Sequence, residues 1–263
     1  MSDLVSIITP SFNTEKFVAE TIKSVINQSY QNWEMLIVDD SSTDNSIEII
    51  KSFNDDRIKL FVNNTNKGAA ISRNFALKEA KGKWIAFLDS DDLWHPDKLS
   101  KQVNFMKRNN YQFSYTNYIE IDENSKPNGN LITGPKILSK KSLKNFCYQG
   151  CLTVMYDREK IGLIQVKNLP KNNDYALWLK AIEKSNCYLL PEILASYRKR
   201  QGSISNYSYI KLIKFHYYLW RNGEDKSRLT ATLFTVRNLF FGLLKKIYYK
   251  KNFNRSNLWK EIQ

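Results

Sequence analysis

The chain has 263 residues, enough for a large domain with a substantial core, and 42% hydrophobic with 25% charged residues excludes a disordered protein. It carries a net charge of +14, and residues 207–263 hold 12 basic and 3 acidic residues, so the excess is concentrated in the tail. Such an excess indicates an anionic partner: nucleic acid, an acidic membrane surface or a phosphorylated substrate.

Other classes of protein are excluded by what the chain lacks. Its three cysteines form neither a disulfide framework nor a zinc pattern, which favours thiols in a reducing cytoplasm. The N-terminal residues lack the basic stretch of a signal peptide. No run of 18 apolar residues exists, so we expect no membrane-spanning helix.

Strand-like and helix-like segments alternate over the first ninety residues. We expect strands at Val5–Thr9, Glu34–Val38, Ile58–Val62 and Trp84–Leu88. The helices between them include one from an Asp44 cap to about Phe53, and Ala69–Ala80. This alternation predicts an α/β fold with a mostly parallel sheet flanked by helices. The loops 10–13, 39–44 and 89–92 should therefore converge at one edge.

The pattern is looser after Pro96. It predicts a helix at Lys98–Arg108, a strand at Phe113–Glu120 and a loop at Asn124–Pro135. Farther along it predicts a helix at Tyr175–Ile182 and short strands at Tyr188–Leu190 and Leu194–Tyr197.

The tail, residues 207–263, is expected to form a basic, aromatic, helical extension of a domain spanning 1–206. Six apolar residues in it share one helical face: Leu229, Leu233, Val236, Phe240, Leu243 and Ile247. This face either packs on the domain or lies on an anionic bilayer, and the sequence favours neither.

Three carboxylates, Asp89, Asp91 and Asp92, directly follow the apolar run Trp84–Leu88. Acids so close together repel unless a cation lies between them, and oxygen ligands suit Mg²⁺ and Mn²⁺. A cap onto the turn before Pro96 explains one acid well but three poorly.

Four segments, SIITPSFN, IVDDSSTDNS, NKGAAISRNFAL and FLDSDDLWHPDKL, together resemble the inverting family-2 glycosyltransferases. The resemblance covers roughly residues 4–205. It implies the Rossmann-like GT-A fold, with a mixed, mostly parallel sheet. Residues 1–97 would form its nucleotide-sugar-binding half and 98–206 its acceptor-binding half.

The resemblance implies which residues bind the donor. Asp40 would accept a hydrogen bond from the uracil imide, although it could instead cap its turn, and Phe12 could stack on the base or pack in the core. A basic segment, Tyr197–Ser205, would close over the diphosphate, or be a solvated loop. The implied donor-binding residues are Pro10, Phe12, Asn13, Asp40, Gly68, Arg73, Asp89, Asp92 and Arg198.

The resemblance also assigns the chemistry. Asp91 would bind the divalent metal, Mn²⁺ or Mg²⁺, while Asp89 holds the ribose or a metal-bound water. Asp92 would order the loop or reach the donor sugar. Asp174 matches the family's general base, with a helix N-cap as its alternative role. Asn173 departs from the usual Glu, which leaves the pKa of Asp174 less raised.

The implied function is metal-dependent transfer of a hexose from a UDP-sugar to a glycan on undecaprenyl diphosphate, in O-antigen, capsule or related polysaccharide (lipopolysaccharide) synthesis. Such an enzyme would be cytoplasmic and peripheral on the anionic inner membrane, with no nucleic-acid partner. Two other hypotheses are a nucleic-acid-binding protein that uses the basic tail, and a catalytically silent scaffold with the same fold.

Overall fold

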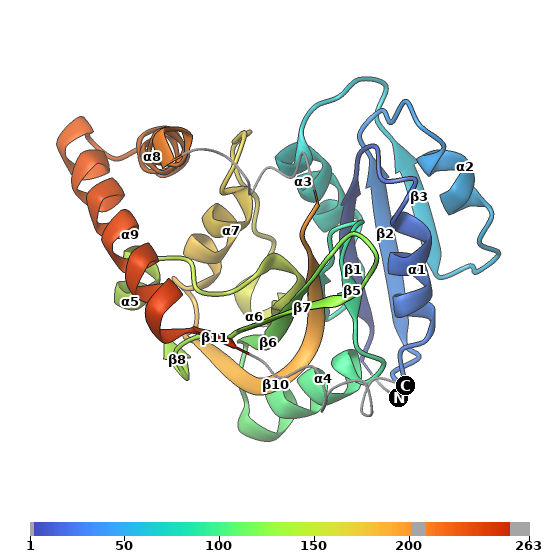
Figure 1. Ribbon diagram of the computed structural model, residues 1–263. Coiled ribbons are helices and arrows are strands. Elements are labelled where there is room, and N and C mark those ends of the chain that lie inside the picture. The colour runs from blue at the N-terminus through green and yellow to red at the C-terminus, as the bar shows by residue number, and fades with distance from the viewer. Residues whose placement is uncertain (1–2, 201–208, 253–263) are drawn as a thin grey trace.

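The computed structural model describes residues 3–200 and 209–252, and its described strands form one mixed sheet in the order β11-β7-β6-β9-β4-β1-β2-β3 (Figure 1). Strand β10 joins it by pairing with β6, β5 and β8. The strands are β1 (Val5–Ser11), β2 (Trp33–Asp39), β3 (Ile58–Val62), β4 (Trp84–Phe87), β5 (Leu93–Trp94), β6 (Phe113–Ile121), β7 (Pro127–Ile132), β8 (Ile137–Leu138), β9 (Met155–Asp157), β10 (Cys187–Arg198) and β11 (Lys250–Asn252).

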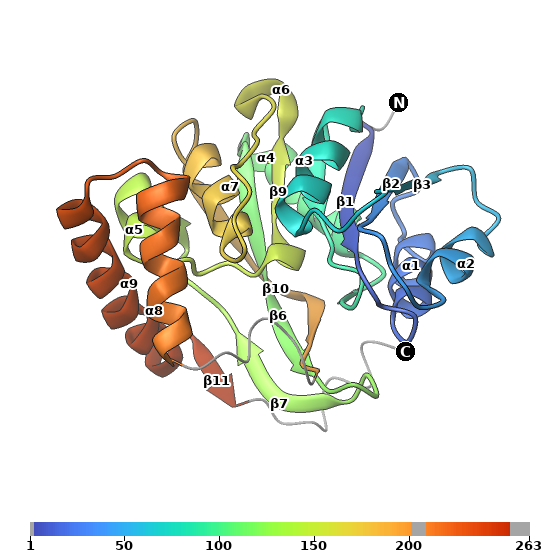
Figure 2. The same ribbon diagram turned by 90° about the horizontal axis from the view of Figure 1, so that it is seen from above.

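Most of the described helices flank this sheet, and the last two pack outside that layer (Figure 2). The described helices are α1 (Val18–Ile26), α2 (Ser46–Lys51), α3 (Ala69–Glu79), α4 (Lys98–Asn109), α5 (Lys140–Asn145), α6 (Arg158–Ile161), α7 (Asn173–Ala181), α8 (Tyr209–Tyr218) and α9 (Arg228–Tyr248), with short turns at Cys151–Thr153 and Leu219–Gly223.

The first half of the sheet is parallel, as predicted: β3, β2, β1 and β4 run side by side. Pro10 lies inside β1 and not in a turn after it. A proline is tolerated there because β4 ends beside Ile8, so no neighbour on that side needs its missing N–H. The strand thus continues two residues farther than its β-branched run indicated.

Alternate residues of the central strands enter two separate cores. Val5 and Ile7 of β1 pack toward α1 and α4, whereas Ile8 packs toward α3 and α7. Because successive side chains of a strand point to opposite faces, each face receives its own apolar layer. This double burial explains why these strands read as continuous apolar runs.

The second half of the sheet corrects two predictions. The segment Asn124–Pro135 is not a plain loop, because β7 pairs with β6 on one side and β11 on the other. The two short strands predicted near Pro191 are one strand, β10, whose register with β6 shifts between Leu190 and Ala195. Proline cannot donate to a ladder, which accounts for the apparent break in the sequence.

The C-terminal helices are attached through polar and aromatic contacts. Trp220 is fully buried and donates its Nε1–H to Asn238 of α9 at 2.8 Å. Asn238 in turn donates to the carbonyls of Lys144 and Asn145. Across residues 3–200 and 209–252, no helix combines the length and apolar character needed to cross a bilayer.

Candidate active site

The predicted convergence of loops at the carboxyl edge of the sheet is present. Asn13, which follows β1, donates its backbone N–H to Ser42 Oγ at 2.9 Å and accepts from the Thr43 N–H at 2.8 Å. Its φ of 49° lies in the left-handed region, which asparagine tolerates. Asn13 therefore joins the first loop to the second.

Phe12 stands at this edge with 43% of its surface exposed. That exposure removes the core-packing alternative for its ring. An aromatic face open to solvent beside a loop junction can stack on a planar ligand.

Asp40 is buried, and both its oxygens already accept hydrogen bonds. Oδ1 accepts from Asn63 Nδ2 at 2.7 Å and from the Lys67 N–H at 2.9 Å, while Oδ2 accepts from the Gly68 N–H at 2.7 Å. Gly68 has a φ of 89°, which favours glycine, and directly precedes α3. Asp40 thus fixes the turn that leads into α3. Its hydrogen bond with Asn63 was not expected, because no sequence motif links these two residues.

The capping role proposed for Asp40 belongs to its neighbour. Asp39 accepts from the N–H and the Oγ–H of Ser42, at 2.8 and 2.6 Å. Asp44 accepts from the N–H of Ser46, the first residue of α2, at 3.0 Å, whereas Asn45, which directly precedes the helix, makes no capping bond with its side chain. The predicted cap by Asp44 is therefore present.

The three acids after β4 occupy different environments. Asp92 is 1% exposed, and burial, followed by repulsion from Asp91 and Asp89, raises its pKa well above the usual value. The pKa of Asp91 is raised as well, first by burial and then by Asp89, against a lowering effect of Arg200. Arg200 Nε donates to Asp91 Oδ2 at 2.7 Å.

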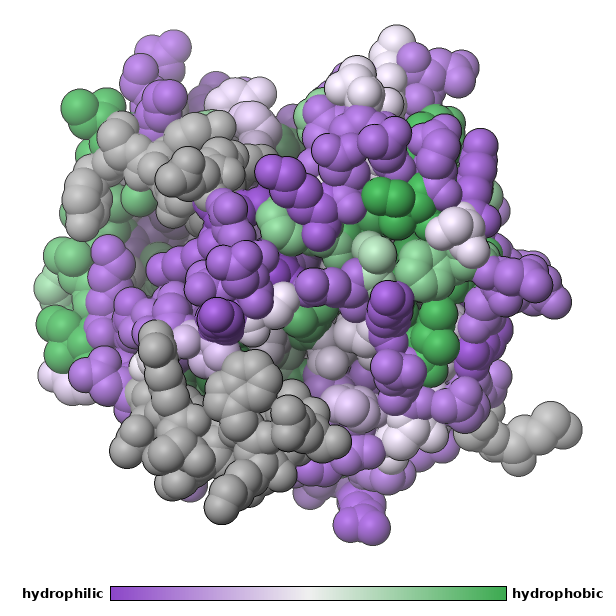
Figure 3. Space-filling model, turned by 45° about the vertical axis from the view of Figure 1, so that its right-hand side comes forward, coloured by the Kyte–Doolittle hydropathy of each residue, from purple (hydrophilic) through white to green (hydrophobic). Residues whose placement is uncertain are grey.

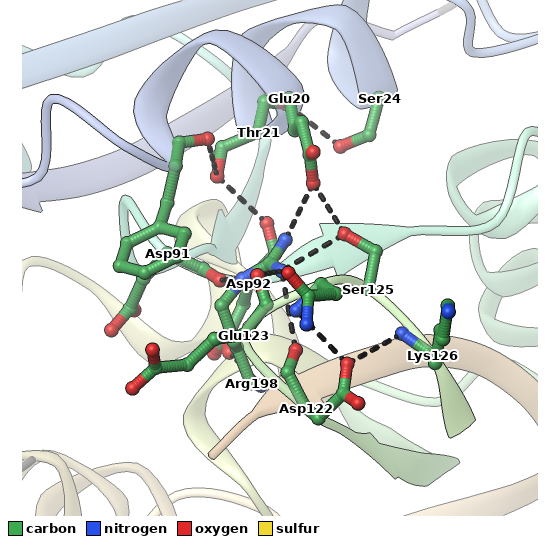
Figure 4. A network of polar contacts seen from close by, with 12 residues as sticks. Glu20, Thr21, Ser24, Asp91, Asp92, Asp122, Glu123, Ser125, Lys126 and Arg198 are labelled. Carbon is green, nitrogen blue, oxygen red and sulfur yellow. Dashed lines mark hydrogen bonds and ion pairs between the residues drawn. The ribbon is translucent and has the colours of Figure 1, made fainter. Parts of the chain in front are cut away.

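Arg198 holds in place the loop that carries Asp89, Asp91 and Asp92, which we call the acidic loop (Figure 4). Its side chain is buried, its Nε donates to the Asp91 carbonyl at 2.7 Å, and its Nη2 pairs with Glu20 at 2.7 Å. Its backbone N–H donates to Asp92 Oδ1 at 2.8 Å, and its Nη1 reaches Ser125. The predicted contact of Arg198 with the donor is therefore not favoured, because its donors are used within the protein. Residues 201–205 of the predicted closing segment lie outside the described residues.

Arg73 joins the acidic loop to the start of α7. This buried guanidinium, on α3, donates through Nη2 to Asp89 and through Nη1 to Asn173. Burial lowers the pKa of Arg73, but Asp89, Cys151 and Asp174 raise it more, so the net shift is upward and the side chain stays charged. One side chain therefore brings together the acidic loop and the start of α7, which are distant in sequence.

Asp174 lies in the first turn of α7, and its Oδ1 accepts from the N–H of Tyr175 at 2.8 Å. Burial raises its pKa, and the nearby Arg73 opposes this shift. The residue that precedes the helix is Asn172, with a φ of 59°, so Asp174 is not the N-cap. Trp178 is fully buried against Phe87, with ring centroids 4.8 Å apart, and is a core residue.

The donor chemistry of the acidic loop fits a hard divalent cation. Asp91 offers two carboxylate oxygens, of which Oδ2 also accepts from Arg200. Within residues 3–200 and 209–252, no three His, Cys, Asp or Glu side chains are grouped to hold a metal by themselves. Mg²⁺ and Mn²⁺ are commonly held by one or two carboxylates together with substrate phosphates, and Asp91 fits that arrangement.

Comparison with known proteins decides the family. The model of glycosyl transferase family 2 matches residues 6–161, more than half of the chain. The chain belongs to glycosyltransferase family 2. It is 41% identical over 233 residues to the putative teichuronic acid biosynthesis glycosyltransferase TuaG of Bacillus subtilis, covering 87% of this chain and 92% of TuaG.

A second relative has a more specific name. The chain is 44% identical over 211 residues to WfgD of Escherichia coli, covering 80% of this chain and 82% of WfgD. WfgD is named a UDP-Glc:α-D-GlcNAc-diphosphoundecaprenol β-1,3-glucosyltransferase. The prediction that this family-2 chain is a glycosyltransferase is confirmed.

Solved structures confirm the fold. The complex of Staphylococcus aureus TarS 1–349 with UDP-GlcNAc superimposes with a TM-score of 0.70 at 21% identity, over 90% of this chain and 72% of that one. The mannosyltransferase PcManGT of Pyrobaculum calidifontis, with GDP-Man and Mn²⁺, gives 0.62 at 16% identity, over 94% and 72%. Both support the predicted GT-A fold.

Proposed function

We propose that this glycosyltransferase inverts the anomeric centre of a hexose as it moves it from a UDP-sugar to a hydroxyl of a lipid-linked glycan. The observation that carries the proposal is the Arg73 bridge, because it holds the acidic loop and the start of α7 at one site. An inverting transfer needs a charge-stabilising group beside the leaving diphosphate and a base on the opposite side of the sugar.

Asp174 is the proposed base. In its ionised form it accepts the proton of the acceptor hydroxyl as that oxygen attacks the anomeric carbon. Burial raises its pKa, which makes its carboxylate a stronger base than an exposed aspartate. Arg73, beside it, opposes this rise and so favours the ionised form of the carboxylate.

The diphosphate side of the site is assigned to the acidic loop. Asp91 would hold a divalent cation, which supplies positive charge to the departing UDP. Asp89 is oriented by Arg73, and Asp92 and Arg198 keep the loop in place. Phe12 offers its exposed ring to the uracil base.

The acceptor class rests on WfgD, whose name specifies a GlcNAc residue on diphosphoundecaprenol. We infer that this chain acts on a similar undecaprenyl-diphosphate saccharide during synthesis of a bacterial surface polysaccharide, such as O-antigen or capsule. An enzyme with that acceptor works as a peripheral protein at the cytoplasmic face of the inner membrane.

The test is a donor panel of UDP-Glc, UDP-GlcNAc, UDP-Gal and UDP-GalNAc, with and without Mn²⁺, against GlcNAc-α-diphosphate on an alkyl chain. Product mass reports transfer, and the anomeric NMR coupling reports inversion. Asp174→Asn and Asp91→Asn should each abolish transfer, while Asp56→Asn, an exposed aspartate far from these contacts in the sequence, should leave it unchanged. Full activity in Asp174→Asn, or retention of configuration, would refute the proposal.

A further inference from the structure

Helix α9 turns a row of large apolar side chains to solvent. Six of them recur at alternating spacings of four and three along one face, and each is between 55% and 72% exposed. We call this face the α9 stripe: Leu229, Leu233, Val236, Phe240, Leu243 and Ile247. A continuous exposed apolar surface of this kind marks a site of interaction.

The orientation of α9 is fixed by its opposite face. Ala231, Thr235 and Asn238 are buried there. Asn238 accepts from Trp220 and donates to two backbone carbonyls of α5, so rotating the helix inward would leave buried polar groups without partners. The stripe is therefore exposed because α9 docks through this other face, together with Phe234, whose ring centroid lies 4.6 Å from that of Trp220.

The segment that carries the stripe has charges of one sign only. Residues 226–252 contain seven Lys and Arg and no Asp or Glu. Arg228 at the start of α9 and Lys246 near its end are exposed, and Tyr248 is 65% exposed beside Lys246. Cations and an aromatic ring flanking an apolar face are typical of a helix that lies in a membrane interface.

We propose that the α9 stripe is the surface with which this enzyme binds an anionic lipid bilayer, with α9 lying parallel to the membrane plane. Charge decides between this occupant and a second copy of the chain. Two copies that met through their stripes would bring two acid-free basic segments together, whereas anionic headgroups are attracted to the same charges.

The position of α9 suits an enzyme with a lipid-linked acceptor. Asn238 of α9 reaches the hydroxyl of Tyr175 at 3.4 Å, and Tyr175 follows the proposed base Asp174 on α7. Figure 1 shows α9 at the left edge of the molecule, beyond α7, and the left rim of the space-filling view in Figure 3 is correspondingly rich in hydrophobic residues. The benefit of membrane binding to the enzyme rests on the proposed function, but the binding of the α9 stripe to lipid does not.

The experiment is vesicle flotation of the full chain without donor or acceptor. Vesicles of phosphatidylcholine, with and without phosphatidylglycerol, are the probes. Leu233→Gln combined with Phe240→Gln should reduce binding to anionic vesicles about tenfold or more. Ile137→Gln combined with Leu163→Gln is the matched control, because these side chains are similarly exposed, at 56% and 50%, on other elements.

The wild type and the control should float with anionic vesicles, and should do so less at high salt. Equal binding by both double variants would overturn the proposal. A wild-type dimer and a monomeric stripe variant in sedimentation would also overturn it, since the occupant of the stripe would then be a second copy.

Transfer to an acceptor with a short alkyl chain, which needs no bilayer, should survive in the stripe variant. If the wild type fails that assay while flotation behaves as expected, only the proposed function is refuted.

Discussion

Arg73 shows how one residue can define a site. Its two Nη groups hold Asp89 and Asn173 at once, and the side chain is 7% exposed. A planar guanidinium holds two separate Nη donors in a fixed fork, whereas an ammonium group has all its donors on one nitrogen at the end of a flexible stem. Asn173 is neutral, so of the two side chains that accept from these Nη groups only Asp89 carries the opposite charge.

Arg73→Met should lower the free energy of unfolding by about 3 kcal/mol, because it leaves Asp89 without its cation. Urea unfolding measures this change. Lys101→Met is the control, since Lys101 pairs with Glu192 at the surface and such pairs contribute about 1 kcal/mol or less. Similar losses for both variants would contradict the structural role of Arg73.

Asp174 predicts a pH dependence whose sign follows from its raised pKa. The folded protein holds this proton to higher pH than the unfolded chain does. The free energy of unfolding therefore falls as pH rises through the pKa of Asp174 in the folded protein. Asp174→Asn removes this loss, so it should be inactive and yet more stable than wild type at about pH 8, with the difference disappearing near pH 4.

Thermal unfolding across that pH range checks the sign. Asp56→Asn, an exposed position, should show no difference from wild type at either end. A variant Asp174→Asn that is less stable than wild type at alkaline pH would mean that the charged carboxylate stabilises the fold, contrary to its raised pKa.

At the scale of elements, α9 depends on one buried amide. Asn238 makes hydrogen bonds with Trp220 and with the end of α5, so Asn238→Ala leaves an indole N–H and two carbonyls without partners. We expect a loss of about 2–3 kcal/mol in the free energy of unfolding. Hydrogen exchange should become faster in α9 while β1 and β2 remain protected. Thr232→Ala, on the exposed face, should change neither measurement.

The sequence predicted the parallel half of the sheet well, because strands buried on both faces must be continuous apolar runs. It missed β7, whose residues PNGNLI have turn composition and become a strand only by pairing with β6 and β11. The spacing of apolar residues by four and three identified the α9 stripe, but such spacing cannot say which face of the helix packs against the rest of the protein. The docking face was decided here by Ala231, Thr235 and Asn238 together with Phe234, through partners on other elements.

The site was predictable to the same extent. Local motifs singled out the acids after β4 and Asp174 as candidates, and their roles stay predictions. They could not show that Arg198 is buried beneath the acidic loop, because its partner Glu20 lies 178 residues away. Nor could they show that both oxygens of Asp40 are engaged by the turn before α3. Roles that depend on long-range contacts are invisible to spacing.

For the whole molecule, donor-side ligands should act as a clamp between distant parts of the chain, since the acidic loop contacts α1 through Thr21 and α7 through Arg73. Mn²⁺ and UDP together should raise the melting temperature more than the sum of their separate effects. Each ligand that binds only the folded state adds stability by mass action, about 2.7 kcal/mol at a hundred times its Kd.

The stabilisation by Mn²⁺ should be larger at higher pH, because Asp91 has a raised pKa and must lose its proton to bind a cation. Asp91→Asn should keep the effect of UDP alone and lose the extra stabilisation by Mn²⁺; an undiminished combined effect in that variant would assign the cation to other ligands.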